Sequence, residues 1–294
     1  MSIDIFVVTH KKYKLPHLNI YKPIVAGAFE YDMDLFPKNY LKDDVGDNIS
    51  HLHDLYSEYT VTYWAWKNSK ADIIGINHYR RYFIKGGWFN YFLCLFNPSK
   101  LLDKFVLNEK DINTLFEEHY QCIMPKKQWR VNRTVREEFL SANSAELLNT
   151  VEKVIDRFTP EYSPYFTKVF DSTENYQKCI CVMTKEYFDK YSNWIFDIFE
   201  ELKKTGFNGS NREFAFLGER LINVWVEYQK NECKLLVKEC FFINTEFPMF
   251  AVFKNHTELI IPRWIKFFLR IVSKLGIEIV IGNGNCKIQR RTYK

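Results

Sequence analysis

Short apolar runs alternate along this chain with longer stretches whose apolar residues recur every three or four positions. The apolar runs, each typical of a buried strand, lie at Ile3–Val8, in the first half of Asp72–Phe83, and at Cys122–Met124, Lys178–Met183 and Leu235–Ile243. The periodic stretches, which predict amphipathic helices, are Leu52–Trp66, Glu109–His119, Asn143–Arg157, Lys185–Lys204 and Arg212–Gln229. Strands interspersed with helices indicate an α/β fold, with a sheet between layers of helices.

The apolar run in Asp72–Phe83 stops abruptly at a polar cluster. The cluster consists of Asn77, His78, Tyr79, Arg80 and Arg81. In open α/β sheets, ligands bind beyond the carboxyl ends of strands. Guanidinium groups stay charged and bind phosphate oxygens bidentately. The cluster therefore predicts a site for an anionic ligand; the alternative is a surface turn with two solvated arginines.

Polar residues also follow the first apolar run directly. Thr9, His10 and Lys11 occupy the loop where many nucleotide-using α/β enzymes hold the base or the phosphates. We therefore expect these residues to contact a ligand; the alternative is a basic surface loop. The chain has no GxGxxG and no GxxxxGK[ST] motif, which excludes a Rossmann dinucleotide fingerprint and a P-loop.

An acidic and amide-rich loop precedes the first predicted helix. Asp44, Asp47 and Asn48 lie beside Gly46, and one such side chain is enough to cap the helix. The additional acidic and amide side chains favour a loop that holds a hydroxylated or phosphorylated ligand near the helix N-terminus. Earlier in the chain, Asp32 and Asp34 superficially match a metal-binding DxD motif, but no convincing strand precedes them and the spacing is common by chance.

The helix predicted at Arg212–Gln229 carries the strongest candidate for a catalytic base. Glu219 lies outside the main apolar stripe, and its helical neighbours are mostly apolar. Loss of solvation would raise the pKa of its carboxyl and suit it to general-base chemistry. The alternative is an ordinary surface glutamate, and Glu213 is the competing base. A second basic and aromatic cluster, with Trp129 and Arg130, follows Cys122–Met124 and is a candidate for binding phosphate or an acceptor sugar.

Two segments depart from the α/β pattern. The aromatic insertion at residues 85–107 is expected either to be buried under another element or to lie against lipid. In the tail, residues 256–294, Leu259–Leu275 predicts an amphipathic helix. Its basic face comprises Arg263, Lys266, Arg270 and Lys274. Because no acidic residue is interleaved, we expect this helix to lie in a membrane interface rather than to dock on the protein.

Composition narrows the class of protein. The net charge of +5 is mild and no nucleic-acid-binding motif occurs, which excludes a dedicated nucleic-acid binder. Aromatic residues make up 17%, which indicates sugar-stacking surfaces or a membrane interface. The 7 cysteines lack CxxC or zinc spacing, so we expect reduced thiols in the cytosol. Neither a signal peptide nor a transmembrane helix is predicted.

Four sequence blocks in this order resemble a family of bacterial polysaccharide-biosynthesis glycosyltransferases, long catalogued as a domain of unknown function and typical of capsule and O-antigen gene clusters. The blocks are DVGDNIS at Asp44–Ser50, TVTYWAWKN at Thr60–Asn68, GINHYRRYF at Gly75–Phe83 and FLGERLINVW at Phe216–Trp225. The resemblance covers roughly Ile3 to Asn244. The insertion and the tail lie outside it.

The resemblance implies a GT-A-like mixed sheet flanked by helices over residues 1–250, with a Rossmann-like half that binds a nucleotide sugar. It also implies a UDP-galactose or UDP-galactofuranose donor and an inverting outcome. His78, Tyr79, Arg80 and Arg81 fall where metal-dependent relatives of this fold carry DxD. No acidic pair stands there, which puts dependence on Mn²⁺ or Mg²⁺ in question.

By the same resemblance, Thr9, His10 and Lys11 would lie near the uridine, and Asp44, Asp47 and Asn48 near ribose or sugar hydroxyls. Arg80 and Arg81 would neutralise the diphosphate leaving group. Glu219 would activate the acceptor, with Glu213 and Arg220 beside it. The expected acceptor is a lipid-linked oligosaccharide at the inner face of the cell membrane, where the protein would be peripheral. The alternatives are a transferase of another nucleotide-activated group and a non-catalytic, membrane-docked scaffold.

Overall fold

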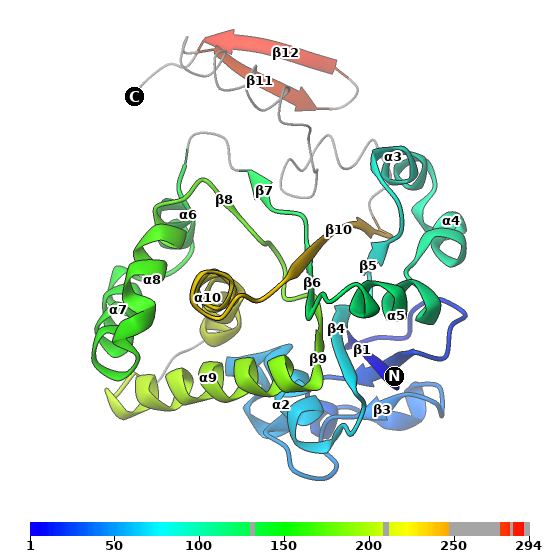
Figure 1. Cartoon of the computed structure of the whole chain (residues 1–294), viewed down its shortest axis with the longest axis horizontal. Coiled ribbons are helices and arrows are strands. Elements are labelled where there is room, and N and C mark those ends of the chain that lie inside the picture. The colour runs from blue at the N-terminus through cyan, green and yellow to red at the C-terminus, as the bar shows by residue number, and fades with distance from the viewer. Residues whose placement is uncertain (130–132, 208–211, 247–276, 283–284, 291–294) are drawn as a thin grey trace.

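A computed structural model gives the arrangement of most of the chain, with a central sheet covered on both faces by helices (Figure 1). The residues that it describes are 1–129, 133–207, 212–246, 277–282 and 285–290. In this part of the chain, no helix is both long enough and apolar enough to cross a membrane.

The strands of the main sheet are β1 (Ile3–Thr9), β2 (Tyr21–Val25), β3 (Leu41–Lys42), β4 (Ile73–His78), β5 (Arg81–Ile84), β6 (Cys122–Pro125), β9 (Cys181–Thr184) and β10 (Val237–Asn244). The remaining strands form two-stranded sheets, β7 (Gln128–Trp129) with β8 (Glu174–Asn175), and β11 (Ile277–Gly282) with β12 (Asn285–Arg290).

The α-helices are α1 (His53–Tyr56), α2 (Tyr59–Asn68), α3 (Trp88–Phe96), α4 (Pro98–Phe105), α5 (Glu109–Glu117), α6 (Val135–Leu140), α7 (Ala145–Phe158), α8 (Ser163–Phe170), α9 (Lys185–Lys204) and α10 (Glu213–Glu232). Short 3-10 helices are η1 (Ala28–Glu30), η2 (Met33–Leu35), η3 (Ser50–Leu52) and η4 (Pro160–Tyr162).

The main sheet is mixed, and β4 lies at its centre. Its strand order is β3-β2-β1-β4-β5-β10-β6-β9, and β9 also pairs with β4. Strands β1 to β4 run parallel to their neighbours in this group, whereas β9 is antiparallel to both β4 and β6. The first part of β4 pairs with β9, and its end turns into β5 through the pair His78↔Arg81. The prediction of a mixed α/β sheet flanked by helices is thus confirmed.

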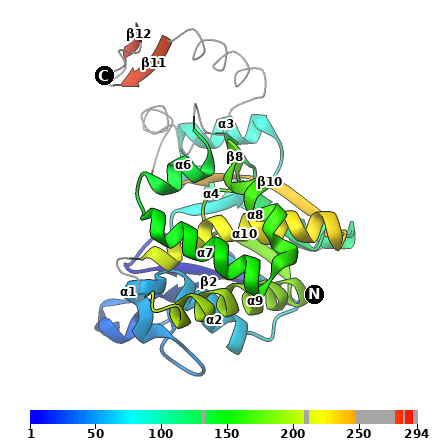
Figure 2. The ribbon, with the colours of Figure 1, turned by 90° about the vertical axis from the view of Figure 1, so that its left-hand side faces the viewer.

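The two faces of the sheet carry separate apolar cores. On one face, Ile74 and Ile76 of β4 pack in a cluster with residues of α2, α7, α9 and α10. On the other face, Ile73 packs in a cluster with residues of α3, α4 and α5. This division follows from the strand geometry, because successive side chains point to opposite faces. Figure 2 shows α7, α9 and α10 on the first of these faces.

The prediction of one continuous helix over Leu52–Trp66 is wrong. The chain forms η3 and α1, breaks at Ser57, and begins α2 at Tyr59. Ser57 has a φ of 45°, outside the helical region, while its N–H donates to the carbonyl of His53 (2.7 Å) and ends α1. The apolar periodicity continues across the break, and for that reason periodicity alone does not reveal it.

The insertion at residues 85–107 folds as α3 and α4. Trp88 and Tyr91 of α3 pack on Phe241 of β10, with ring centroids 4.7 and 4.9 Å apart. One side of the insertion is therefore buried under the protein's own fold. The helix predicted at Leu259–Leu275 lies outside the described residues. Further along the tail, β11 and β12 form an antiparallel pair that the sequence pattern did not predict.

Candidate functional site

Two cationic side chains meet on one carboxylate at the carboxyl ends of β1 and β4. Lys11 Nζ and Arg80 Nη1 each lie 3.1 Å from an oxygen of Glu246. Lys11 Nζ also lies 4.8 Å from the centre of the Tyr79 ring, a cation–π contact. Burial alone would raise the pKa of Glu246, but Lys11 and Arg80 outweigh it and lower that pKa. The pair of cations thus already holds an anionic group between two strand ends.

Backbone hydrogen bonds bring these segments together. The Tyr79 N–H donates to the Val8 carbonyl (3.0 Å), which ties the turn after β4 to β1. The Thr245 N–H donates to the Arg80 carbonyl (2.8 Å), which ties the same turn to the end of β10. Sequence proximity gives no hint of the second contact, and for that reason Glu246 was not among the predicted site residues.

A row of polar side chains crosses β4, β5 and β10 next to this ion-pair cluster. His78 pairs with Arg81, and Arg81 pairs with Asn244, so the three side chains lie on the same face of the sheet. His78 Nδ1 and Asn244 Nδ2 are buried and have no hydrogen-bond partner among the described residues. Such atoms are rare in folded proteins, and they indicate a place where water or a ligand is bound.

Positive charge dominates this region, and the pKa values of its two histidines are lowered. Burial, Arg81 and Arg80 lower the pKa of His78 to about 2. Burial also lowers the pKa of His10, followed by the charges of Lys11, Arg212 and Arg80. Burial is the largest cause of both shifts, and the neighbouring cations add to it, because another positive charge is unfavourable beside them. The region therefore favours an anion.

Asn77 belongs to the same strand but points to the other face of the sheet, since adjacent residues alternate. It is 1% exposed and lies opposite Val7 of β1. Neither its Nδ2 nor its Oδ1 has a hydrogen-bond partner among the described residues. A fully buried amide with both atoms unsatisfied costs stability, which argues for a role other than folding.

The acidic loop after β3 is organised by a residue that the sequence analysis did not select. Asp43 is fully buried and accepts four hydrogen bonds. They come from the N–H groups of Gly27 and Ala28 (2.9 Å each) and the hydroxyls of Ser50 and Thr60 (2.6 Å each). Asp43 thus joins four segments and has the character of a structural residue.

The three predicted ligand-binding residues of this loop differ in their surroundings. Asp47 accepts from the Tyr63 hydroxyl (3.2 Å), and Asn48 accepts from the Ser50 N–H (3.2 Å). Asp44 Oδ1 is buried and has no hydrogen-bond partner in the part of the chain described. Of the three, Asp44 is therefore the residue whose presence is least explained by a role in holding the loop together.

Glu219 of α10 is ionised and tightly bound. Its Oε1 accepts from the Lys178 N–H (2.7 Å), and its Oε2 is bonded to Arg220, which also lies 3.5 Å from Glu138. Burial would raise the pKa of Glu219, but Arg220, Lys178 and Arg81 outweigh it and lower the pKa to about 2. The expected rise in pKa is therefore wrong, because the helix neighbours considered in the sequence were apolar while the contacting groups are cationic.

Gly218 allows α10 to approach α2 closely. A Cβ at this position would lie 2.4 Å from the ring of Tyr59, which is itself buried and hydrogen-bonded to Tyr191 (2.8 Å). One turn further on, Asn223 brackets Tyr176 by accepting from its N–H (2.6 Å) and donating to its carbonyl (3.0 Å). The FLGERLINVW block thus fixes the loop around residues 176–178 against α10.

The remaining predicted site residues lie elsewhere. Asp32 caps η2 by accepting from the Asp34 N–H (3.1 Å), as capping residues do. Trp129 pairs with Glu174 through β7 and β8, Arg130 lies outside the described residues, and Glu213 is the first residue of α10.

The residues at the end of β4 do not fit a divalent metal. Mg²⁺ and Mn²⁺ prefer carboxylate, carbonyl and water oxygens, whereas arginine offers only donors. The carboxylate of Glu246 is close, but both of its oxygens are bonded to cations. No group of three or more His, Cys, Asp or Glu residues gathers at metal-binding distances within the described ranges.

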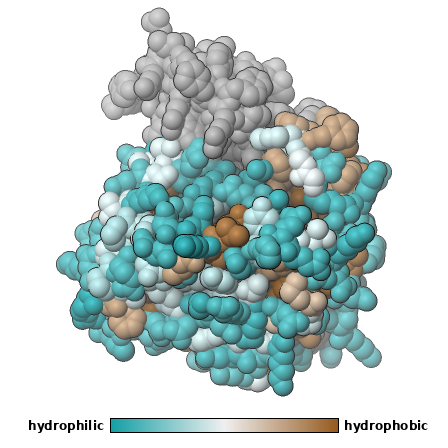
Figure 3. Space-filling view, viewed as in Figure 1, coloured by the Kyte–Doolittle hydropathy of each residue, from teal (hydrophilic) through white to brown (hydrophobic). Residues whose placement is uncertain are grey.

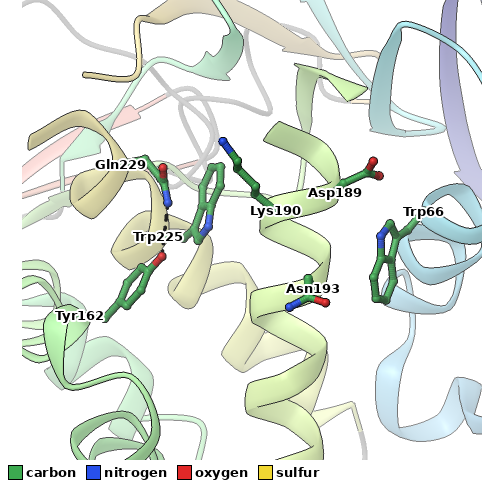
Figure 4. A pocket seen from close by; sticks show the side chains of 7 residues that line it. All are labelled: Trp66, Tyr162, Asp189, Lys190, Asn193, Trp225 and Gln229. Atoms are coloured by element: carbon green, nitrogen blue, oxygen red, sulfur yellow. Dashed lines mark hydrogen bonds between the residues drawn. The ribbon is translucent and has the colours of Figure 1, made fainter. Parts of the chain in front are cut away.

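A shallow hollow of about 510 Å³ lies on the helical face, and Figure 4 shows its lining. The lining residues are Trp66, Tyr162, Asp189, Lys190, Asn193, Trp225 and Gln229. Helix α9 starts beside Asp72, at the amino end of β4, because the Lys185 N–H donates to the Asp72 carbonyl (2.8 Å). The start of α9 thus lies at the end of β4 opposite to the ion-pair cluster, and the hollow over its first turns is not part of that site.

Comparison with known proteins places the chain in a family. No curated protein matches it. Among solved structures, it is similar to the apo structure of WbbM, a bifunctional glycosyltransferase, with 25% identity and a TM-score of 0.68. The match covers 83% of this chain and 45% of the WbbM chain, so the chain spans less than half of that protein. Residues 4–231 match the model of the domain of unknown function DUF4422, and the chain therefore belongs to the DUF4422 family.

Proposed function

We propose that the chain is a glycosyltransferase that uses a UDP-sugar, with galactose or galactofuranose favoured. The observation that carries the proposal is the meeting of Lys11 and Arg80 on a single carboxylate at the ends of β1 and β4. Ligands of open α/β sheets bind at this place. The similarity to a bifunctional glycosyltransferase supports the reaction class, and the four sequence blocks support a GT-A-like fold.

In this proposal the donor diphosphate takes the place of the Glu246 carboxylate. Lys11 and Arg80 then contact its oxygens, and Arg81, in the polar row beside them, adds positive charge. When the bond from the anomeric carbon to the diphosphate breaks, negative charge develops on the leaving oxygen. Fixed cations stabilise that charge more than they stabilise the ground state. The residues that line this place therefore do the work that a metal ion does in DxD enzymes, and no step is assigned to a metal.

The acceptor hydroxyl attacks the anomeric carbon from the side opposite to the leaving group, which inverts the configuration. Glu219 is the proposed general base. Its pKa of about 2 keeps it ionised but makes it a weak proton acceptor, since efficient bases have a pKa near the working pH. The substitution Glu219→Gln decides between this role and a positioning role. A glutamine still accepts from the Lys178 N–H, so a positioning residue would keep most of the turnover, whereas loss of a base costs 10² to 10⁴-fold.

The proposed acceptor is a lipid-linked oligosaccharide of capsule or O-antigen synthesis, met at the inner face of the cell membrane. The amphipathic pattern of Leu259–Leu275 supports this location. Trp129, Arg130, Glu213 and Arg220 are proposed acceptor contacts.

The test is UDP release from a panel of UDP-sugars in the presence of lipid-linked acceptor, with the full chain and with Arg80→Ala. We expect release with one hexose donor and a loss of about 10²-fold for the variant, as for removal of one group that stabilises the developing charge. Lys104→Ala, an exposed lysine on α4, is the control. Unchanged turnover in Arg80→Ala would exclude the leaving-group role.

Two other functions give different results in the same assay. A transferase of another nucleotide-activated group would bind UDP or a related nucleotide but release none from UDP-sugars. A non-catalytic scaffold would show no UDP-dependent thermal shift at all. The buried, unsatisfied polar atoms of His78 and Asn77 argue against the scaffold, because a fold kept only for docking gains nothing from them.

A further inference from the structure

Helix α3 presents a row of phenylalanines to solvent. Phe89, Phe92 and Phe96 are 74%, 42% and 63% exposed, and their spacing places them on one side of the helix. Figure 3 shows an apolar area over this helix, toward the upper right of the view. Contiguous exposed apolar surface of this kind marks an interaction site, whereas scattered apolar residues do not.

The opposite side of α3 is anchored firmly. Tyr91, Cys94 and Leu95 are buried, and Trp88 packs on Phe241 while stacking on Phe92 at 5.8 Å. The exposed row is therefore held in place by a rigid base. It is not the frayed end of a loose helix.

The sequence segment that holds this row carries positive charge and no negative charge. Between Lys85 and Leu102 the sequence contains no aspartate or glutamate. Lys100, beyond the helix, is exposed, whereas Lys85, before it, is paired with Asp111 (3.5 Å). Lysines beside aromatic side chains match the chemistry of an anionic bilayer surface, where rings enter the interface and ammonium groups meet lipid phosphates.

The row also lies close to the candidate site along the fold. β5, which begins with Arg81, leads directly into α3, and the Ser99 hydroxyl of α4 donates to the Thr245 carbonyl (3.1 Å), one residue before Glu246. A surface that contacts α3 is thus near the cluster of Lys11, Arg80 and Glu246.

We propose that the phenylalanine row of α3 inserts into the interface of an anionic lipid bilayer and holds the carboxyl ends of β1 and β4 near that surface. The inference rests on the proposed function only for its biological purpose, which is to present the site to a lipid-linked acceptor. The membrane contact itself is independent of any catalytic activity.

The experiment measures binding of the full chain to sedimented vesicles of phosphatidylcholine with and without phosphatidylglycerol. The test variant is Phe89→Ser with Phe96→Ser. The matched control is Leu35→Ser with Phe158→Ser, two side chains that are 74% and 44% exposed on other elements. We expect the partition coefficient on phosphatidylglycerol vesicles to fall at least tenfold for the test variant and to stay unchanged for the control. Lys100→Glu should weaken binding to the anionic vesicles alone.

Three outcomes would overturn the proposal. The first is that the unmodified protein does not bind vesicles, and the second is that both double-serine variants bind equally well. The third is that the unmodified protein is a dimer by light scattering, while the test variant is a monomer with unchanged vesicle binding, since the row would then be a contact between two copies. Turnover on a soluble acceptor keeps the two proposals apart, because the test variant should retain it whether or not vesicle binding is lost.

Discussion

The loop after β3 and the turn between β4 and β5 both follow parallel strands at the same edge of the sheet, and both are rich in polar residues. They differ in what their polar atoms contact. In the first, Asp43 is surrounded by four donors. In the second, Arg80 shares one carboxylate with Lys11 from the loop after β1, and His78 and Asn77 at the end of β4 keep buried atoms without partners among the described residues.

This difference separates polar residues that build the fold from polar residues that the fold leaves unsatisfied. A carboxylate with all its hydrogen bonds made inside the protein contributes to stability. A buried amide or imidazole atom that lacks a hydrogen bond lowers stability, and it persists where function requires it. Two clusters can be equally rich in polar residues in the sequence and still differ in this respect. Variants of the first should be tested for stability, and variants of the second for function as well.

The largest effect is expected for Asp43→Ala. Four buried donors would lose their acceptor, and we expect the free energy of unfolding to fall by about 3–5 kcal/mol. Urea unfolding followed by circular dichroism measures it. Asp47→Ala, in the exposed part of the same loop, is the control and should cost less than about 1 kcal/mol. Equal losses for both variants would remove the distinction between Asp43 and the rest of the loop.

Glu219→Gln tests a second carboxylate with internal partners. The pKa of Glu219 is about 2 in the folded chain and near 4.5 when unfolded, so its ionised form stabilises the fold above pH 4.5. That contribution, on the order of 2–3 kcal/mol, is lost as the pH falls from 4.5 through 2. We expect the variant to be less stable at pH 7 and the difference from the unmodified protein to shrink over this range in urea titrations. A difference that is constant with pH would exclude the ion pair as its cause.

Asn77→Leu tests the unsatisfied side of the comparison. Replacing a buried amide that lacks partners with an apolar side chain of similar size should leave the free energy of unfolding unchanged or raise it by about 1 kcal/mol. If the amide contacts the donor, UDP release should fall in the same variant. Asn113→Leu is the matched control, since Asn113 Oδ1 is also buried and has no partner in the described part of the chain, but belongs to α5 rather than to a strand end. A marked loss of stability in Asn77→Leu would show that the amide serves the fold.

The smallest effect is expected for Glu246→Gln. The substitution removes the negative charge that competes with a diphosphate for Lys11 and Arg80, and we expect UDP to bind about three- to tenfold more tightly. Isothermal titration calorimetry measures the affinity, and Glu161→Gln in η4 serves as the control for charge. Weaker binding of UDP would mean that Glu246 orders the cations for the ligand.

Much of the fold could be predicted from the sequence because strands and long helices each have a strong periodic signal. Ile3–Thr9, Ile73–His78 and α9 were predicted almost to the residue, and α10 to within three residues at each end. The break at Ser57 was missed because apolar spacing continues across it, and β7 and β8 were missed because two-residue strands carry no periodicity.

The candidate site could be predicted only in part. The residues that follow strands in the sequence, Lys11 and Arg80, were found because topology places strand ends together. Glu246 reaches them from β10 through a pairing with β5 that no local pattern specifies. Asp43 was overlooked beside Asp44 because the two differ in burial and in hydrogen bonding, neither of which the sequence shows. The pKa of Glu219 was misjudged because the adjacent Arg220 pairs with it and because Lys178 and Arg81 approach it from distant parts of the chain.

The position of Glu246 couples binding of the donor to the interactions that hold Glu246 in place. Glu246 belongs to the chain that leaves the sheet after β10, and Thr245 before it is bonded to the Arg80 carbonyl, the Tyr13 hydroxyl and the Ser99 hydroxyl. If a diphosphate and this carboxylate compete for the same cations, every interaction that holds Glu246 in place weakens the donor's affinity. By thermodynamic linkage the donor weakens that hold by the same factor. Occupancy of the donor site would thus be communicated through Glu246 to the chain that follows it.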